Sequence, residues 1–186
     1  MADGVARASD RIRRLVGNLA AAARLDTEGV EIQTGPTEMA RLLSGAAAEF
    51  KSQQDRIGFL EDPSALGSKI WADQELAVRA LVAVIENALE LSPDDSSVEI
   101  QVSTGKELAT VSVLDRGPGI PEEALQHVFE AFAQADASTT RTHQGVGIGL
   151  YLTQRIMSAH AGRIDVLPRD GGGSVFRLSF PVFTPG

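Results

Sequence analysis

Apolar residues recur with helical spacing in several stretches of the chain. Between Ser9 and Asp26 they fall at every third or fourth position, which predicts a helix with one apolar stripe. Similar spacing predicts helices over 37–56, 72–91, 121–132 and 148–161, the second of which has Asp73 as a candidate N-cap. The first helix fits two interpretations equally well. It packs on its own domain, or it is half of a helical hairpin whose other helix is missing.

Alternation of apolar and polar residues predicts the strands. They fall at 29–34, 57–62, 97–104, 108–115, 162–167 and 175–182. The segment 133–144 is polar, rich in small residues and weakly periodic, so we expect a loop there. Strands that follow one another closely favour a largely antiparallel sheet. The predicted fold class is therefore α+β, with the helices on one face of the sheet.

Composition and charge narrow the class of protein. A chain of 186 residues, 43% of them hydrophobic, is long enough for one domain with a short appendage. The net charge of −8 argues against binding to nucleic acid or an anionic membrane surface. Cysteine is absent, which excludes disulfides and thiolate metal sites. No apolar run reaches about 18 residues, so we expect no membrane span within this chain. The expected location is the cytoplasm, whether or not the parent protein is anchored in a membrane.

Two polar residues stand out in apolar surroundings. Asn87 lies in a predicted helix of Leu, Val and Ala, where it is either a hydrogen-bonded core residue or an oxygen ligand for Mg²⁺. Asp115 ends an apolar strand and is followed by Gly117 and Gly119. It is either a turn residue or a carboxylate that accepts from a donor such as an adenine amino group. Each pattern alone is common in proteins.

A third stretch, THQGVGIGLYL at 142–152, has glycines at alternate positions just before a predicted helix. Such glycines serve a tight turn, or they let backbone N–H groups approach a phosphate at the start of the helix. The chain has no G-x-x-x-x-G-K-[ST] stretch, so this is not a Walker-type loop.

Together, the order and spacing of these stretches resemble the Bergerat-type ATP-binding domain of bacterial sensor histidine kinases. ENAL resembles the family's N box, DRGPGIP its first glycine box and VFEAF its F box. AQADASTTRTHQGVGIGL resembles the ATP lid with the second glycine box, and GGGSVFRLSFP the closing strand. The resemblance runs from about Gly29 to Pro181. It implies a two-layer α/β sandwich with an ATP-binding catalytic domain over 27–186. The segment 1–26 is similar to the second helix of the family's dimerisation and phosphotransfer hairpin.

The resemblance also implies roles for individual residues. Asn87 would coordinate Mg²⁺, Asp115 would bind adenine, and Phe129 and Phe132 would anchor the base of the lid. Arg141 would reach the γ-phosphate, or is a solvated lid charge. Glu86 is a candidate base or acceptor-orienting group, or a solvated charge. The implied nucleotide-binding residues are Asn87, Asp115, Gly117, Gly119, Ile120, Phe132, Arg141, Gly145, Val146, Gly147, Ile148, Gly149 and Leu150.

The N box departs from the family pattern. Ala83 stands where many members have asparagine, and where ATP-hydrolysing relatives have the glutamate that activates water. Glu90 replaces a common cation that touches phosphate, and Leu91 replaces an aromatic residue or histidine. A carboxylate near a triphosphate adds repulsion unless its side chain turns away. Gln144, Val146 and Ile148 replace commoner residues around the second glycine box.

A phosphoacceptor histidine is also missing. His127, His143 and His160 are the only histidines, and none has an acceptor-like context. We expect each of them to lie at the surface or at a helix cap. We therefore expect the catalytic part of a longer kinase, acting with ATP and Mg²⁺ on a histidine of the missing hairpin helix. A response regulator and a second copy of the chain are the other expected partners. Two alternatives remain: a degenerate module that signals through protein contacts without nucleotide, and an anti-sigma-type serine kinase of the same fold.

Overall fold

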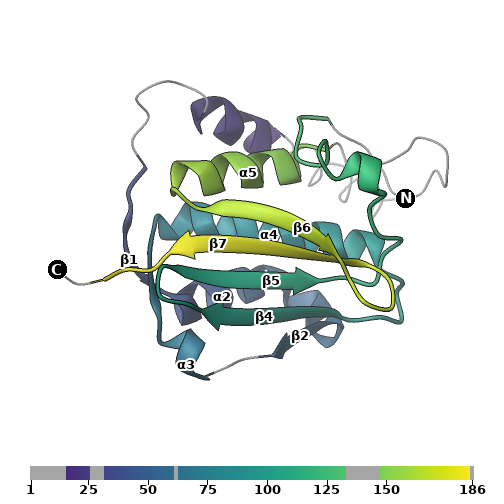
Figure 1. Ribbon diagram of the computed structural model, residues 1–186, viewed down its shortest axis with the longest axis horizontal. Coiled ribbons are helices and arrows are strands. Elements are labelled where there is room, and N and C mark those ends of the chain that lie inside the picture. Colours follow the sequence, from purple (N-terminus) through teal and green to yellow (C-terminus); the bar gives the residue numbers. More distant parts are fainter. Residues whose placement is uncertain (1–15, 26–31, 61–62, 133–146, 185–186) are drawn as a thin grey trace.

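The computed structural model describes residues 16–25, 32–60, 63–132 and 147–184. A helix over 16–25 precedes the main body of the chain (Figure 1). The first half of the body contains β1 (Gly35–Glu38), α2 (Met39–Ala47), the 3₁₀ segment η1 (Ala48–Arg56), β2 (Ile57–Leu60), α3 (Pro63–Leu66), β3 (Lys69–Ala72) and α4 (Gln74–Leu91). The second half contains β4 (Val98–Thr104), β5 (Leu108–Leu114), the 3₁₀ turn η2 (Glu122–Ala124), α5 (Gly149–Ala159), β6 (Arg163–Pro168) and β7 (Ser174–Pro181).

The main sheet has five strands in the order β2-β4-β5-β7-β6. Its β2–β4 pair is parallel, and the other three pairs are antiparallel. Residues alternate between buried and half-buried along β4, β5 and β7, so one face of the sheet is apolar. The helices α2, α4 and α5 lie on that side (Figure 1). This arrangement confirms the predicted α+β sandwich with a mixed, mostly antiparallel sheet.

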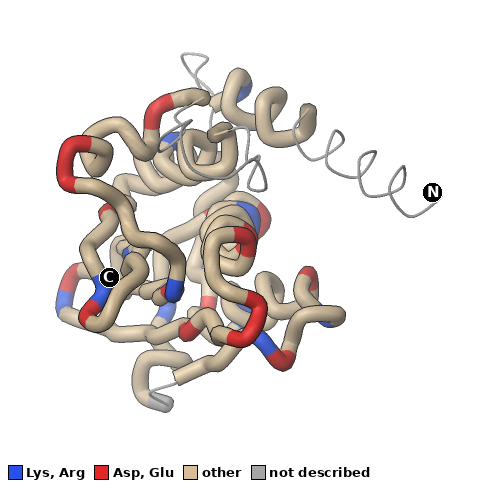
Figure 2. The backbone as a smooth tube through the Cα atoms, turned by 90° about the vertical axis from the view of Figure 1, so that its right-hand side faces the viewer, with Lys and Arg blue, Asp and Glu red and all other residues tan. Residues whose placement is uncertain are grey.

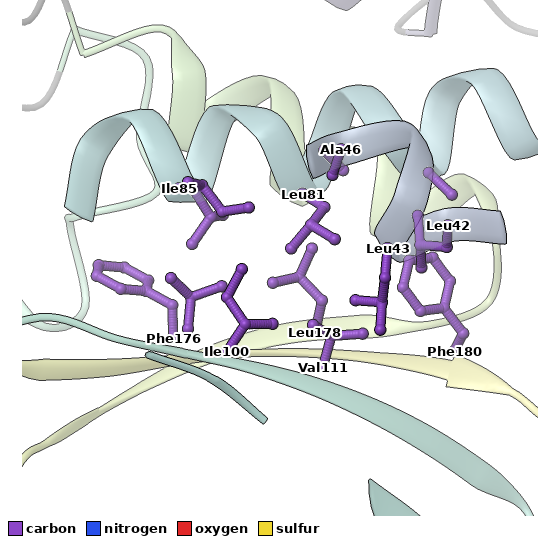
Figure 3. Close-up of a cluster of buried hydrophobic side chains, with 14 of the residues drawn as sticks. Leu42, Leu43, Ala46, Leu81, Ile85, Ile100, Val111, Phe176, Leu178 and Phe180 are labelled. Atoms are coloured by element: carbon purple, nitrogen blue, oxygen red, sulfur yellow. The ribbon is translucent and has the colours of Figure 1, made fainter. Parts of the chain in front are cut away.

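The hydrophobic core fills the space between the helices and the sheet. Leu81 and Ile85 of α4 point toward Phe176 and Leu178 of β7 (Figure 3), and all four side chains are at most 1% exposed. Burial of large apolar side chains stabilises the fold by about 1.5–3 kcal/mol each. The core fixes α4 against the sheet, and the candidate site lies where both of these elements end.

Local sequence explains why α4 forms where it does. The Asp73 carboxylate accepts from the Leu76 N–H at 3.2 Å, which caps the first turn as predicted. The helix ends at Ser92 because Pro93 cannot continue it. Arg56 then donates to the carbonyl oxygens of Leu89, Ser92 and Pro93. A cation at a helix C-terminus complements the helix dipole, so Arg56 holds the last turn of α4 in place.

The first part of the domain differs from the sequence prediction. Of the predicted strand 29–34, the structure describes residues 32–34. The prediction is wrong for these residues, because they lie outside a strand and β1 begins only at Gly35. The predicted helix 37–56 begins only at Met39 and loses helical geometry at Phe50 and Gln53. The reason is tertiary: β1 pairs with β3, a strand that the sequence pattern did not reveal.

The predicted helix over 121–132 is also wrong as a continuous helix. Only Glu122–Ala124 form a 3₁₀ turn, and separate turns follow. Phe129 is buried and packs edge-on against Phe176 with ring centroids 6.5 Å apart. Phe132 adopts a left-handed φ of 64°, which ends any helical path. The predicted loop 133–144 lies outside the described residues.

The helix over 16–25 contacts α4 of the main body. Ala22 is 1% exposed, and the Asn18 side-chain oxygen accepts from the Arg79 guanidinium of α4 at 3.0 Å. Val16 and Leu19 remain exposed on the same helix. Within the described residues, no helix is long and apolar enough to span a membrane.

Candidate nucleotide-binding site

Asp115 is the best-defined group of the candidate site. It follows the last residue of β5, and only 2% of its surface is exposed. Its Oδ1 atom accepts from the backbone N–H groups of Gly117 at 2.8 Å and Ser174 at 3.0 Å. Within the described ranges both hydrogen bonds reach Oδ1, so Oδ2 remains as the acceptor for a ligand. The carboxylate is therefore held in one orientation at the end of the sheet.

Electrostatic effects on Asp115 oppose one another. Burial raises the pKa of this carboxyl group, because a charge is less stable away from water. The hydrogen bonds from Gly117 and Ser174 and the nearby Arg169 guanidinium act in the other direction and lower the pKa. The net direction is upward, which is typical of groups at functional sites.

The glycines around Asp115 permit close backbone packing. A Cβ atom at Gly117 would lie 3.1 Å from both the Asp115 Oδ1 atom and the Leu91 carbonyl oxygen. Gly119 has a φ of +78°, which favours glycine. At Gly173, a Cβ atom would lie 2.2 Å from the Asp115 carbonyl oxygen. The turn before β7 thus presses directly against the residue that carries the carboxylate.

The helix α4 connects this carboxylate to the second glycine box. Its last residue, Leu91, adjoins Gly117, and Ser92 accepts from the Arg116 backbone N–H at 3.0 Å. Two turns earlier, Ala83 faces Gly149, where an added Cβ atom would lie 3.8 Å from the alanine methyl. Asn87 lies on α4 between these two contacts. The structure therefore brings the N box and parts of both glycine boxes together.

Polar groups on α4 differ in exposure. Asn87 and Glu86 are both half-buried, and Glu90 is exposed at the last turn. In the part of the chain that the structure describes, the Asn87 side-chain amide makes no hydrogen bond. It remains available as an oxygen ligand, which fits the chemistry expected of a Mg²⁺ ligand.

The second glycine box leads into α5. Gly147 has a φ of +68°, Ile148 is buried, and α5 begins at Gly149 with Leu150 half-buried behind it. Within the described residues, no side chain caps this helix and its first turn carries no acidic residue. Its N–H groups and the helix dipole therefore favour an anion at this end.

The F box contacts the second glycine box through its backbone. The Phe132 N–H donates to the Gly147 carbonyl oxygen at 3.2 Å, while its side chain is 62% exposed. Phe129 lies in the core instead. Ile120 is half-buried beside the first glycine box. The predicted residues Arg141, Gly145 and Val146, together with His143, lie outside the described residues.

Three groups that support the site were not identified from the sequence. From the sequence alone, Gly173 is one of several glycines in a predicted turn, Ser92 lies at the end of a predicted helix, and Arg169 is a charged residue before a predicted turn. Arg169 is in fact nearly buried and donates to the Asp115 carbonyl oxygen at 3.0 Å. Sequence periodicity contains no signal for such long-range contacts.

The remaining histidines are accounted for by structure. His160, expected to lie at the surface or at a cap, is 3% exposed and joins the ends of two helices. Its Nε2 accepts from the Asp73 N–H at 2.9 Å, so the proton is on Nδ1, which donates to the Ile156 carbonyl oxygen at 2.7 Å. His127 is exposed and pairs with Glu130 at 2.7 Å.

The described residues bring together a buried carboxylate, closely packed glycines, a half-buried amide and an uncapped helix start, an arrangement that fits a nucleotide-binding site. Comparison with known proteins agrees. The sequence profile of the family described as "Histidine kinase-, DNA gyrase B-, and HSP90-like ATPase" matches residues 72–184. The chain belongs to this family, and it is an ATP-binding catalytic domain of the sensor histidine kinase type.

Individual relatives show the same class. The sensor protein SrrB of Staphylococcus aureus (strain NCTC 8325 / PS 47) is 30% identical over 93% of this chain, which spans 30% of that protein's length. The structure of full-length ShkA in complex with AMPPNP matches with a TM-score of 0.79 and 26% identity, covering 97% of this chain and 38% of ShkA. The histidine kinase domain of the E. coli osmosensor EnvZ matches with a TM-score of 0.62 and 25% identity, covering 85% of this chain and 94% of that domain.

Proposed function

We propose that this chain binds ATP with Mg²⁺ and donates the γ-phosphoryl group to a histidine on a separate helical hairpin of a two-component sensor kinase. The single observation that carries the proposal is the fixed Asp115 carboxylate, whose Oδ1 atom is held by two backbone N–H groups. The Oδ2 atom is then positioned to accept from the amino group of adenine. The backbone at Gly117 and Gly119 would form the wall beside the ring.

The phosphates would lie between α4 and the start of α5. The N–H groups from Gly147 to Leu150 would face the phosphates there, and the dipole of α5 attracts negative charge. The implied phosphate-facing residues Gly145, Val146 and Arg141 would complete this side. Mg²⁺, when bound, neutralises charge on the phosphates, and the Asn87 oxygen would hold it.

Ala83 favours phosphoryl transfer over hydrolysis. It lies where a water-activating carboxylate would have to stand, next to Gly149, and a methyl group cannot accept a proton. Glu86 is the nearest acidic neighbour of Asn87 in sequence, and adjacent helical residues point about 100° apart. Catalysis would then rest on positioning and charge stabilisation, with Glu86 orienting the acceptor.

The partners follow from the segment 1–26, which we assign to the second helix of the hairpin. The exposed Val16 and Leu19 on its described part fit a helical partner, the missing hairpin helix or that of a second copy. A response regulator would then take the phosphoryl group from the hairpin histidine. Figure 2 shows acidic and basic residues interspersed along the chain, which fits protein partners rather than nucleic acid or a membrane surface. The site of action would be the cytoplasm.

The comparisons give no support to the alternative of a nucleotide-free signalling module. The test is phosphotransfer from labelled ATP to a separately supplied hairpin protein, with a hairpin whose acceptor histidine is replaced by glutamine as control. We expect label on the intact hairpin alone, and none with Asp115→Asn. ATP binding without transfer to any hairpin would contradict the kinase proposal and favour the signalling module.

A further inference from the structure

Arg169 is a nearly buried cation directly behind Asp115. Its side chain is 8% exposed, although it precedes a turn at the surface end of β7. The Nη1 atom donates to the Asp115 carbonyl oxygen at 3.0 Å, and the Nη2 atom pairs with the Glu99 carboxylate of β4. A buried guanidinium is costly unless it is paired and hydrogen-bonded, and here both conditions are met.

This guanidinium joins three parts of the site. Glu99 lies on β4, Asp115 follows β5, and Arg169 itself begins the turn into β7. The Arg169 N–H donates to the Gly173 carbonyl oxygen at 3.1 Å, which shapes the turn that delivers the Ser174 N–H to the Asp115 Oδ1 atom. The Arg169 side chain thus holds the main chain of Asp115, while the Arg169 backbone N–H holds the turn that carries the donor to the carboxylate.

The charged groups around Asp115 are few, and their positions are defined. Arg169 is the cation that lowers the pKa of Asp115. Glu99 pairs with Arg169 and partly compensates its charge. The Arg116 guanidinium turns instead to the carbonyl oxygens of Asp170 and Gly172, at 3.1 and 3.4 Å. Glu90, on the last turn of α4, is exposed to water.

We propose that the Glu99–Arg169 pair sets purine selectivity at the nucleotide site, by holding Asp115 as an oriented carboxylate that accepts only from a purine amino group. This inference rests on the proposed binding of ATP. A carboxylate accepts from the 6-amino group of adenine and repels the 6-carbonyl oxygen of hypoxanthine. A protonated carboxyl group has an O–H donor, so it tolerates the 6-carbonyl purine. Arg169 is therefore a positioning residue with an effect on selectivity.

The experiment compares the affinities of ATP and inosine triphosphate for the full chain, by calorimetry across a pH series. For Arg169→Met we expect ATP affinity to fall about fivefold to tenfold, while inosine triphosphate affinity changes less than about twofold. ATP binding is also expected to be lost at a higher pH than in the wild type, because the carboxylate has lost its cation.

A second variant is expected to shift the pH limit of ATP binding in the opposite direction. Glu99→Gln keeps an acceptor for Arg169 but removes the compensating negative charge, so ATP binding is expected to persist to a lower pH than in the wild type. The matched control is Arg177→Met. Arg177 pairs with Asp165 at 2.6 Å on the same sheet and touches no group of the site among the described residues. We expect this control to leave the ratio of the two affinities unchanged.

The outcomes separate the two proposals. If the wild type binds neither nucleotide, the proposed function fails and this inference fails with it. If the wild type binds ATP and Arg169→Met weakens both nucleotides equally, the role of Arg169 is structural and the selectivity proposal alone is wrong. If Arg169→Met does not fold, Glu99→Gln decides: a pH limit for ATP binding that is unchanged or higher overturns the proposal.

Discussion

Replacing Gly173 by alanine tests the packing that orients Asp115. Gly173 has a φ of +101°, and an added Cβ atom would lie 2.2 Å from the Asp115 carbonyl oxygen and 2.9 Å from its carbonyl carbon. Both neighbours are backbone atoms, so neither can rotate away. The turn must move by roughly an ångström to restore ordinary contact. That movement pulls the Ser174 N–H away from the Asp115 Oδ1 atom.

The expected loss of unfolding free energy in Gly173→Ala has two parts. An alanine in this backbone region costs about 1–3 kcal/mol of unfolding free energy. Loss of a hydrogen bond to a charged group adds about 1.5–3 kcal/mol. We therefore expect Gly173→Ala to lower the free energy of unfolding by about 2.5–6 kcal/mol, a large share of the total stability of a small domain.

The neighbouring glycine provides a matched control. Gly172 has a φ of +99°, and nothing lies within 4 Å of its added Cβ atom. Gly172→Ala should therefore incur the backbone cost alone, about 1–3 kcal/mol. Urea denaturation of both variants gives the comparison, and ATP titration at a temperature where both are folded should show weakened binding in Gly173→Ala only. Equal loss of stability in the two variants would refute the packing argument.

Three further predictions concern single side chains. His160→Phe removes the acceptor of the Asp73 N–H and should lower the free energy of unfolding, measured in urea, by about 1–3 kcal/mol. The control His127→Phe, at an exposed position, should change it by less than about 0.5 kcal/mol. Equal effects of the two variants would contradict the role of His160. Glu90→Lys should strengthen ATP binding by about threefold to tenfold at low salt, with the gain shrinking as salt is added; no gain would show that this side chain is far from the phosphates. Because burial raises the pKa of Asp115, its contribution to stability is present below the unfolded pKa and is lost as pH rises through the folded pKa. Near neutral pH, Asp115→Asn should therefore have a melting temperature no lower than that of the wild type. A clearly lower melting temperature would contradict the upward direction of the Asp115 pKa.

The predictable parts of the fold are those with strong local signals. The helix α4 has a capping aspartate, a long apolar face and a terminating proline, and the sequence places its end correctly. The strands β4 and β5 and the first half of β7 alternate because one face of the sheet is buried. These signals place Asn87 on α4 and Asp115 after β5, whereas the roles of both residues in binding ATP stay predictions from the family resemblance.

The missed parts depend on contacts between distant segments. The strand β1 has four residues and includes Pro36, so only its pairing with β3 identifies it. The F-box segment has helical spacing, but the burial of Phe129 and the left-handed Phe132 break the helix into turns. Arg169 contacts Glu99 across 70 positions of the chain. Local propensity cannot reveal such contacts.

The most direct test of the account is a calorimetric titration of the full chain with ATP, with and without Mg²⁺, alongside Asp115→Asn. We predict saturable binding to one site in the micromolar range, stronger with Mg²⁺ and lost in Asp115→Asn while the fold remains intact. The absence of binding up to millimolar ATP would contradict the account. The altered N box, with Ala83, Glu90 and Leu91, would then be the feature that needs explanation.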